Sequence, residues 1–302
     1  MKPTLLVLAA GMGSRYGSLK QIDPVGPSGE TIIDYSIYDA IRAGFGKVVF
    51  IIRKSFEQDF KEIFISKLQP YIQVEYVFQE IDKLPVGLTV SPERTKPWGT
   101  AHAILMAKDV IHEPFAVING DDFYGSGAFQ TMADYLVSLT ADEQTHYSLV
   151  GYQVGNTMSE HGTVSRGVCL PDEQGFLQSV TERTNIQYTH GGIAYTDEAG
   201  AFVFLKPETL VSMNFWGFTP EYFKQTEPMF SDFVKANSDS LKAEFYIPTA
   251  IDALINGSMA KVKVLKSNAR WFGVTYKEDK PVVIEKLAQL IKMGIYPAQL
   301  WK

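Results

Sequence analysis

Residues 4–20 read TLLVLAAGMGSRYGSLK. The run Thr4–Ala9 is continuously apolar, which is typical of a strand buried on both faces of a sheet. It leads into a glycine-rich turn that carries two cations, Arg15 and Lys20. Glycines after a buried strand let backbone N–H groups approach an anion, and open α/β sheets bind ligands at the carboxyl ends of their strands. The stretch therefore predicts a parallel sheet that begins with a phosphate-binding loop.

Two better-known phosphate loops do not fit these residues. Counting from Gly11, the sixth place of the dinucleotide fingerprint holds Tyr16 instead of glycine, and no Gly-Lys-Ser/Thr sequence ends the loop as in a P-loop. The alternative is a glycine-rich turn with two solvated basic residues. The position directly after the first strand favours the phosphate site.

The rest of the chain alternates strands and helices up to about residue 140. Helical spacing over 31–43 ends at Gly44 and separates the strand 4–9 from a second apolar strand, 47–52, which makes a βαβ unit. Further expected elements are helices over 56–65 and 100–108 and strands over 72–78 and 115–119. The pattern is that of an α/β protein.

From Tyr147 to Phe218 the sequence changes to short β-like runs separated by Gly, Asn and Asp, which predicts a mixed or antiparallel part. These runs are 147–154, 164–170, 176–181, 201–205 and 212–218. Helices over 220–236, 246–255 and 277–293 and strands over 261–264 and 271–274 are expected to follow. No repeat or linker divides the chain, so we expect one Rossmann-like body over residues 1–302, with a mixed, mainly parallel sheet flanked by helices and a β-rich insertion.

Composition limits the partners and the compartment. Lys and Arg total 28 against 34 Asp and Glu, and the net charge of −6 argues against nucleic acid as the main partner. No run approaches the roughly 18 apolar residues that span a bilayer, so we expect no membrane association. The single cysteine, Cys169, excludes an intramolecular disulfide and a cysteine-rich metal site. A reducing, cytoplasmic location fits this usage.

A pair of carboxylates follows the strand 115–119. Asp121 and Asp122 stand at its carboxyl end, where adjacent carboxylates suit Mg²⁺, which keeps waters and substrate phosphate oxygens as its other ligands. The alternative is a helix N-cap or a turn pair. The five histidines have no helical His-x-x-x-His spacing, which argues against a zinc site, and His102 is expected to be structural or part of a base pocket.

Motifs along most of the chain carry a family resemblance. They are Leu8–Lys20, Gly99–Ala103, Gly120-Asp121, His161–Val164, Val180–Arg183, Ser212–Gly217, Glu244–Pro248 and Trp271–Thr275. In this order they resemble the sugar-1-phosphate nucleotidyltransferases (NDP-sugar pyrophosphorylases) of the nucleotidyltransferase superfamily. The resemblance implies a GT-A-like nucleotidyltransferase fold, with a nucleotide-binding half over 1–140 and a sugar-phosphate-binding half over 141–302.

The resemblance also implies roles for single residues on the nucleotide side. Arg15 would bind the β- and γ-phosphates, Lys20 would bridge the phosphates of both substrates, and Asp121 would hold Mg²⁺. Arg94 stands five residues before Gly99, where many relatives have a base-reading glutamine, so the identity of the base does not transfer. The nucleotide-binding residues implied are Leu8, Ala9, Ala10, Gly11, Gly13, Ser14, Arg15, Arg94, Gly99 and Thr100.

On the sugar side, the resemblance implies that Gly162, Glu182 and Asn214 contact the sugar. Arg183, which stands where the family usually has lysine, would reach the sugar's phosphate. The chain departs from the family in two places. The short Arg15–Lys20 spacing is closer to that of molybdenum-cofactor nucleotidyltransferases. Where relatives supply a second metal ligand after the tryptophan, this chain has Gly273 and Thr275, with Glu278 and Asp279 a turn later.

The implied reaction joins a nucleoside triphosphate to a sugar 1-phosphate with Mg²⁺ as cofactor, releasing pyrophosphate and forming an NDP-sugar. Three alternatives stay open: a transferase for another phosphate acceptor, of choline phosphate or molybdenum-cofactor type; a GT-A glycosyltransferase; and a catalytically silent subunit that binds nucleotide sugar. Relatives commonly self-associate, so the resemblance allows for a homo-oligomer.

Overall fold

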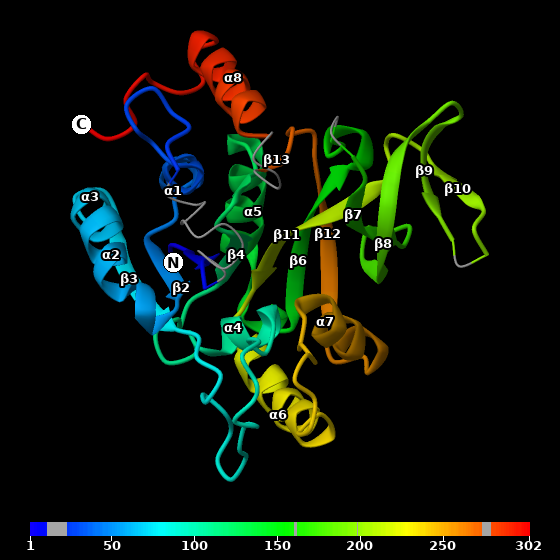
Figure 1. Cartoon of the computed structure of the whole chain (residues 1–302). Coiled ribbons are helices and arrows are strands. Elements are labelled where there is room, and N and C mark those ends of the chain that lie inside the picture. Colours follow the sequence, from blue (N-terminus) through cyan, green and yellow to red (C-terminus); the bar gives the residue numbers. More distant parts are fainter. Residues whose placement is uncertain (11–22, 160–161, 198, 274–278) are drawn as a thin grey trace.

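The computed structural model describes residues 1–10, 23–159, 162–197, 199–273 and 279–302. The chain forms a central sheet with helices packed on both faces (Figure 1). No helix in the described part of the chain is both long and apolar enough to cross a membrane. The predicted phosphate loop, residues 11–22, lies outside the described residues.

The apolar run at the start of the chain forms the central strand, as predicted. Leu5, Leu6 and Val7 are fully buried, because the strand is covered on both faces. It pairs in parallel with a neighbour on either side, and a further strand extends the sheet in the same direction. These strands are β1 (Thr4–Leu8), β2 (Lys47–Ile52), β3 (Gln73–Phe78) and β4 (Phe115–Asn119).

Two hydrophobic clusters lie on opposite faces of the sheet, since successive strand residues point to opposite sides. Leu5 and Val7 pack against one group of helices and Leu6 against the other. The first group consists of α1 (Ile32–Arg42), the helical stretch 54–68 that contains α2 (Glu57–Phe60) and α3 (Ser66–Leu68), α5 (Ser126–Ser138) and α8 (Asp279–Lys292). The second consists of α4 (Thr100–Leu105), α6 (Glu221–Ala236) and α7 (Ile247–Asn256).

An antiparallel strand connects the two halves of the sheet. β11 (Leu210–Phe218) pairs on one side with β6 (His146–Gln153), which pairs in parallel with β12 (Lys261–Ser267). On its other side β11 changes partner, because its first residues pair with β7 (Val164–Pro171) and its last residues with β4. The sheet therefore forks along β11. The predicted mixed, mainly parallel sheet flanked by helices is confirmed.

The β-rich insertion is antiparallel and projects to one side of the molecule (Figure 1). Besides β7 it contains β8 (Leu177–Thr189), β9 (Gly192–Thr196) and β10 (Phe202–Leu205). β8 continues well past the predicted end at residue 181, and β9 was not predicted. The second half of β8 is largely exposed and polar, so it lacks the hydrophobic alternation from which a strand is recognised.

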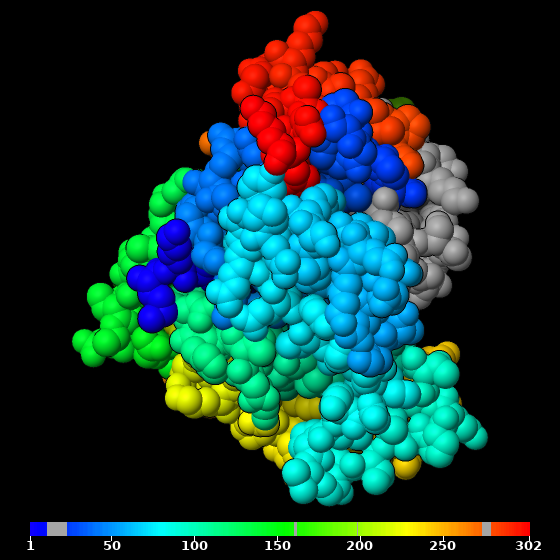
Figure 2. All heavy atoms as spheres, turned by 90° about the vertical axis from the view of Figure 1, so that its left-hand side faces the viewer, coloured from blue at the N-terminus to red at the C-terminus, as the bar shows by residue number. Residues whose placement is uncertain are grey.

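The C-terminal residues pack against α1 and the turn before it, as Figure 2 shows. Trp301 donates its indole N–H to Asp34 Oδ1 over 2.9 Å, and the Leu300 amide donates to Glu30 Oε1 over 3.2 Å. Asp34 also caps α1 by accepting the Thr31 amide over 2.7 Å, which satisfies one of the free N–H groups of the first turn.

A buried carboxyl on α1 gives the fold a pH-dependent stability. Asp39 is 1% exposed and accepts the Tyr296 hydroxyl over 2.6 Å; burial raises its pKa to about 7, which that hydrogen bond and the charge of Arg42 only partly oppose. Because the folded state keeps its proton where the unfolded state has lost it, the free energy of unfolding should fall as the pH rises from about 4 to about 7, by roughly 3–5 kcal/mol.

Asp39→Asn should remove this part of the pH dependence, since the amide carries no charge at any pH. The measurement is urea unfolding at pH 5, 6, 7 and 8 for wild type, Asp39→Asn and the exposed-surface control Asp59→Asn. Parallel pH curves for wild type and Asp39→Asn would show that the Asp39 carboxyl is ionised in the folded state throughout this range.

Candidate functional site

The fork in the sheet brings the sequence-predicted Asn214 beside the end of β4. Asn214 lies in β11 between the residues that pair with β7 and those that pair with β4, and its backbone is left-handed, with φ of 62°. Its Nδ2 donates to Asn119 Oδ1 over 2.6 Å, and its Oδ1 accepts the Trp216 indole N–H over 2.9 Å. Asn119 in turn donates to Asp122 Oδ2 over 2.9 Å. A continuous polar chain thus joins Asn214 to the carboxylate pair.

The two adjacent carboxylates follow β4 directly, as predicted. Asp122 begins the short strand β5 (Asp122–Phe123), and its Oδ2 also lies 3.2 Å from the Tyr124 hydroxyl. Burial raises the pKa of Asp122, and the neighbouring charge of Asp121 raises it further, while Asn119, Arg166 and Tyr124 act in the opposite direction. Two carboxylates held this close repel each other, and a bound cation would relieve that repulsion.

A glycine makes room for the Asp122 carboxylate. β5 pairs with β13 (Phe272–Gly273), which places Gly273 opposite Asp122. A Cβ at position 273 would lie 2.7 Å from Asp122 Oδ1 and 3.0 Å from the Trp271 ring, so no side chain fits there without displacing one of them. The carboxylate of Asp122 therefore occupies the space that a side chain at position 273 would take.

On the sugar side, a second glycine lies beside the predicted residues. Gly162 precedes β7, whereas the glycine opposite Glu182 in the β7–β8 register is Gly167, which also pairs with Ser212 of β11. A Cβ at Gly167 would lie 2.9 Å from Val180 Cγ2 and 3.7 Å from Glu182 Oε2, so this strand position tolerates glycine alone. Gly167 is the glycine that the structure brings to Glu182, and only the strand register identifies it.

The predicted Arg183 lies over the Tyr195 ring, 4.8 Å from its centroid, and its backbone pairs with β7 opposite Arg166. A second arginine, which sequence reasoning missed, lies closer to the carboxylates. Arg166 is 8% exposed, lies 4.7 Å from the Trp271 ring centroid, and donates its Nε–H to Thr157 Oγ1 over 3.1 Å. Burial lowers its pKa to about 10, and the charges of Asp122 and Glu182 act against that shift, so Arg166 is a cation at neutral pH.

On the nucleotide side, Leu8 and Ala9 lie at the end of β1, where Leu8 accepts the Gly120 amide over 3.1 Å; Ala10 is buried beside them. Gly99 precedes α4 with φ of 98°, and a Cβ there would lie 2.6 Å from the Phe245 carbonyl oxygen. Thr100 Oγ1 accepts the Ile247 amide over 3.1 Å. The close approach of two backbones explains the glycine at position 99.

Arg94 is a buried structural residue in this loop. It is 2% exposed, stacks over Trp98 with 3.5 Å to the ring centroid, and donates to four backbone carbonyls. These belong to Lys96, Pro97, Ser240 and Ala243, at 2.6 to 3.1 Å. The guanidinium holds the loop onto the segment before Phe245, in contrast to the nucleotide contact expected of it from its place in the sequence.

The side-chain amide that borders Gly99 in space is Gln79, at the carboxyl end of β3. Its Nε2 donates to the Gly99 carbonyl over 2.9 Å and lies 3.3 Å from His102 Nδ1. His102 is fully buried, its Nε2 lies 3.0 Å from the Lys83 carbonyl, and burial lowers its pKa to about 4. A neutral His102 that donates from Nε2 and accepts at Nδ1 therefore fixes the Gln79 amide, in agreement with the structural or base-pocket role predicted for it.

Several predicted site residues lie outside the described part of the chain. They are Gly11, Gly13, Ser14, Arg15 and Lys20. Among the described residues, no three carboxylate, imidazole or thiolate side chains gather into a group that could hold a metal ion by themselves.

Comparison with known proteins agrees with this geometry. The model of the nucleotidyl transferase family matches residues 4–272. The UTP–glucose-1-phosphate uridylyltransferase AglF of Haloferax volcanii is 23% identical over 287 residues, which cover 94% of this chain and 96% of that protein. The inositol-1-phosphate CTP transferase from T. maritima superposes with a TM-score of 0.63 at 13% identity, covering 96% of this chain and 97% of that one.

A UDP-glucose pyrophosphorylase, solved with UDP-glucose, superposes with a TM-score of 0.58 at 18% identity, covering 96% of this chain and 99% of that one. At such identities the solved structures establish the shared fold. The family model spans most of the chain, includes β1 and the carboxylate pair, and ends at Phe272, the first residue of β13. The chain therefore belongs to the nucleotidyl transferase family.

Proposed function

We propose that the protein transfers a nucleotidyl group from a nucleoside triphosphate to a sugar 1-phosphate. A phosphate oxygen of the sugar attacks the α-phosphorus, the bond to the β-phosphate breaks, and pyrophosphate leaves as the NDP-sugar forms. The observation that carries the proposal is the polar chain from Asp122 through Asn119 to Asn214, which connects the end of β4 with the insertion that would hold the sugar. The family match and the uridylyltransferase relative support it.

The two halves divide the work in this proposal. Residues 1–140 hold the nucleotide, with Gly99 and Thr100 next to the base. The polar side chain beside Gly99 is the amide of Gln79 and not the guanidinium of Arg94. Residues 141–302 hold the sugar through Gly162, Glu182 and Asn214, with Gly167 opposite Glu182. Arg183 reaches the phosphate of the sugar. Arg15 and Lys20 neutralise the phosphates, because two anionic substrates must approach each other.

The residues present fit Mg²⁺. Asp121 and Asp122 supply hard oxygen ligands. Because Gly273 has no side chain, the Asp122 carboxylate occupies the place where relatives have a metal-binding side chain after the tryptophan. Waters and substrate phosphates would complete the coordination. When bound, Mg²⁺ would stabilise the charge that develops on the transferring phosphate. Asn119 and Tyr124 hold Asp122 in place by hydrogen bonds to Oδ2.

The proposed location is the cytoplasm, supported by the chain's single cysteine, a buried thiol whose pKa burial raises to about 12. A homo-oligomer is part of the proposal by analogy with relatives.

The test is pyrophosphate release with Mg²⁺, in which UTP, dTTP, CTP, GTP and ATP are each combined with a panel of phosphorylated acceptors. The panel contains several sugar 1-phosphates, inositol 1-phosphate and choline phosphate. Release that requires one triphosphate and one sugar 1-phosphate is the expected result. If pyrophosphate is released only with a non-sugar acceptor, that acceptor takes the place of the sugar 1-phosphate in the proposal. If no pair releases pyrophosphate although the protein binds nucleotide, the result favours a catalytically silent binding subunit.

Asn214→Gly tests the sugar side. Glycine adopts φ of 62° without strain, so the substitution removes only the side chain and its two hydrogen bonds. We expect the KM for the sugar 1-phosphate to rise about tenfold, the effect of losing one or two hydrogen bonds, while the KM for the triphosphate changes little.

Asn214→Ala serves as the matched variant. It loses the same hydrogen bonds but adds the strain of a left-handed alanine, roughly 1–2 kcal/mol. Its melting temperature should fall below that of Asn214→Gly, with the same rise in KM. A KM that follows the melting temperature of the two variants would mean that Asn214 acts on stability alone.

A further inference from the structure

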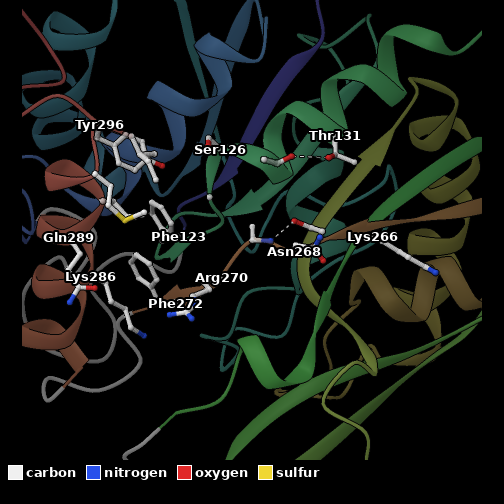
Figure 3. A pocket seen from close by; sticks show the side chains of 17 residues that line it. Phe123, Ser126, Thr131, Lys266, Asn268, Arg270, Phe272, Lys286, Gln289 and Tyr296 are labelled. Carbon is white, nitrogen blue, oxygen red and sulfur yellow. Dashed lines mark hydrogen bonds between the residues drawn. The ribbon is translucent and has the colours of Figure 1, made fainter.

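A cavity of about 680 Å³ lies on the far side of the β5–β13 pair from the candidate site. It is enclosed by the start of α5, the residues after β12, and α8 (Figure 3). Phe123 and Phe272 form one wall, stacked with their ring centroids 4.2 Å apart and their planes at 9°. Leu290, Met293 and Tyr296 add apolar surface from the α8 side. None of these residues has a role in the proposed reaction.

The charge of the lining has one sign. Lys266, Arg270 and Lys286 line the cavity, and among the described residues of its lining there is no aspartate or glutamate. In the described part of the chain, none of the three cations forms an ion pair with a carboxylate; Lys286 Nζ lies 5.3 Å from the Phe272 ring centroid. In a chain with a net charge of −6, a cavity whose described lining carries cations and no acidic side chain favours anions.

The cations and the rings lie next to each other. Figure 3 shows Arg270 and Lys286 beside the stacked Phe123 and Phe272 rings, with Gln289 on the neighbouring turn of α8. An inorganic anion would contact only the cations Arg270 and Lys286, and an uncharged apolar molecule would leave these two cations unneutralised. A ligand that carries both a phosphate and an apolar ring satisfies the whole lining.

We propose that this cavity binds a small organic phosphate with an apolar or aromatic ring and that this binding regulates the enzyme. Phe123 directly follows Asp122, and Phe272 directly precedes Gly273, in the paired strands β5 and β13. A ligand packed on the two rings holds that strand pair and with it the position of Asp122 relative to Gly273. Binding in the cavity and cation binding at the carboxylates are thereby coupled, each changing the affinity of the other.

The regulatory part of this inference rests on the proposed function, whereas the binding part does not. Binding is therefore tested first, without turnover, by titrating the fluorescent probe 1-naphthyl phosphate into the protein. The tests use Arg270→Glu/Lys286→Glu, which reverses two charges, and Gly127→Phe, which adds a bulky ring at an exposed glycine of the lining. A Cβ at Gly127 meets no atom within 4 Å, so this position accepts a side chain. Lys292→Glu on α8, outside the lining, is the control for reversing a charge elsewhere on the same helix.

We expect the Kd for 1-naphthyl phosphate to rise at least about tenfold in the double variant and in Gly127→Phe, and to stay within about twofold in Lys292→Glu. 2-Naphthol and inorganic phosphate alone should each bind more weakly than the combined probe. Equal binding to wild type and to the double variant would overturn the proposed site, and tighter binding of inorganic phosphate would overturn the requirement for a ring.

Coupling is then measured as the affinity for Mn²⁺, followed by its electron paramagnetic resonance signal, with and without saturating 1-naphthyl phosphate. A change of at least about threefold in wild type that disappears in Gly127→Phe is the expected result. An unchanged Mn²⁺ affinity in wild type would overturn regulation through β5–β13. If Mn²⁺ does not bind at all while the probe does, the proposed cation site fails and the organic-phosphate site stands.

Discussion

Replacing Asp121 with asparagine is expected to lower kcat by about a thousand-fold and to weaken Mn²⁺ binding in parallel. A metal ion contributes several kcal/mol to the stabilisation of a phosphoryl transition state, and each 1.36 kcal/mol corresponds to a factor of ten in rate. Asp121 stands directly after β4, beside Asp122, whose pKa is raised by burial and by the charge of Asp121. The measurement is pyrophosphate release across a Mg²⁺ titration, together with direct Mn²⁺ binding.

The control is Asp142→Asn, which removes one negative charge from an exposed turn. It should leave both the rate and the Mn²⁺ affinity unchanged. An Asp121→Asn variant with the same Mg²⁺ requirement as wild type would move the cation to another place in the chain. A lower kcat with unchanged Mn²⁺ affinity would assign Asp121 to the substrate instead of the metal.

The second large effect concerns stability. Arg94→Met should reduce the free energy of unfolding by at least about 3 kcal/mol, because four backbone carbonyls lose their donor and a methionine cannot replace it. The stacking on Trp98 is lost as well. Urea unfolding measures the loss, and Lys83→Met, with its exposed side chain in the same loop, is the control.

The kinetics of the same variant distinguish two roles for Arg94. If its work is to hold the loop, the fraction of Arg94→Met that stays folded should bind the triphosphate with a KM close to that of wild type. A raised KM for the triphosphate together with wild-type stability would instead support the nucleotide contact inferred from its distance to Gly99 along the chain.

The central sheet could be predicted because its strands are continuous apolar runs. β1, β2 and β4 lie within a residue of their predicted bounds, since burial on both faces leaves a clear signal. The far half of β8 and the whole of β9 gave no such signal. They form an antiparallel hairpin in which only a few side chains, such as Ile186 and Ile193, are buried among exposed polar ones, so no continuous apolar run marks them.

In the site, the sequence is most informative where residues are placed by local sequence, and least informative where placement depends on loop length or strand register. The carboxylate pair after β4 is local, and the structure places Asp121 and Asp122 where the sequence predicted. Arg94 was chosen by counting back from Gly99, but a long loop separates β3 from α4, and the amide beside Gly99 is Gln79. Gly167 was missed because its place opposite Glu182 follows from strand pairing alone.

The fork along β11 also has a consequence for how the polypeptide emerges from the ribosome. Val117 of β4 pairs with Trp216 of β11, about 100 residues later in synthesis. Synthesis proceeds at roughly 5–20 residues per second, so the edge of β4 that pairs with β11 stays unpaired for about 5–20 s. During that time β4 is paired only with β1, and its other edge is an open strand edge of the kind that promotes aggregation. We expect this half, expressed alone, to require chaperones to remain soluble.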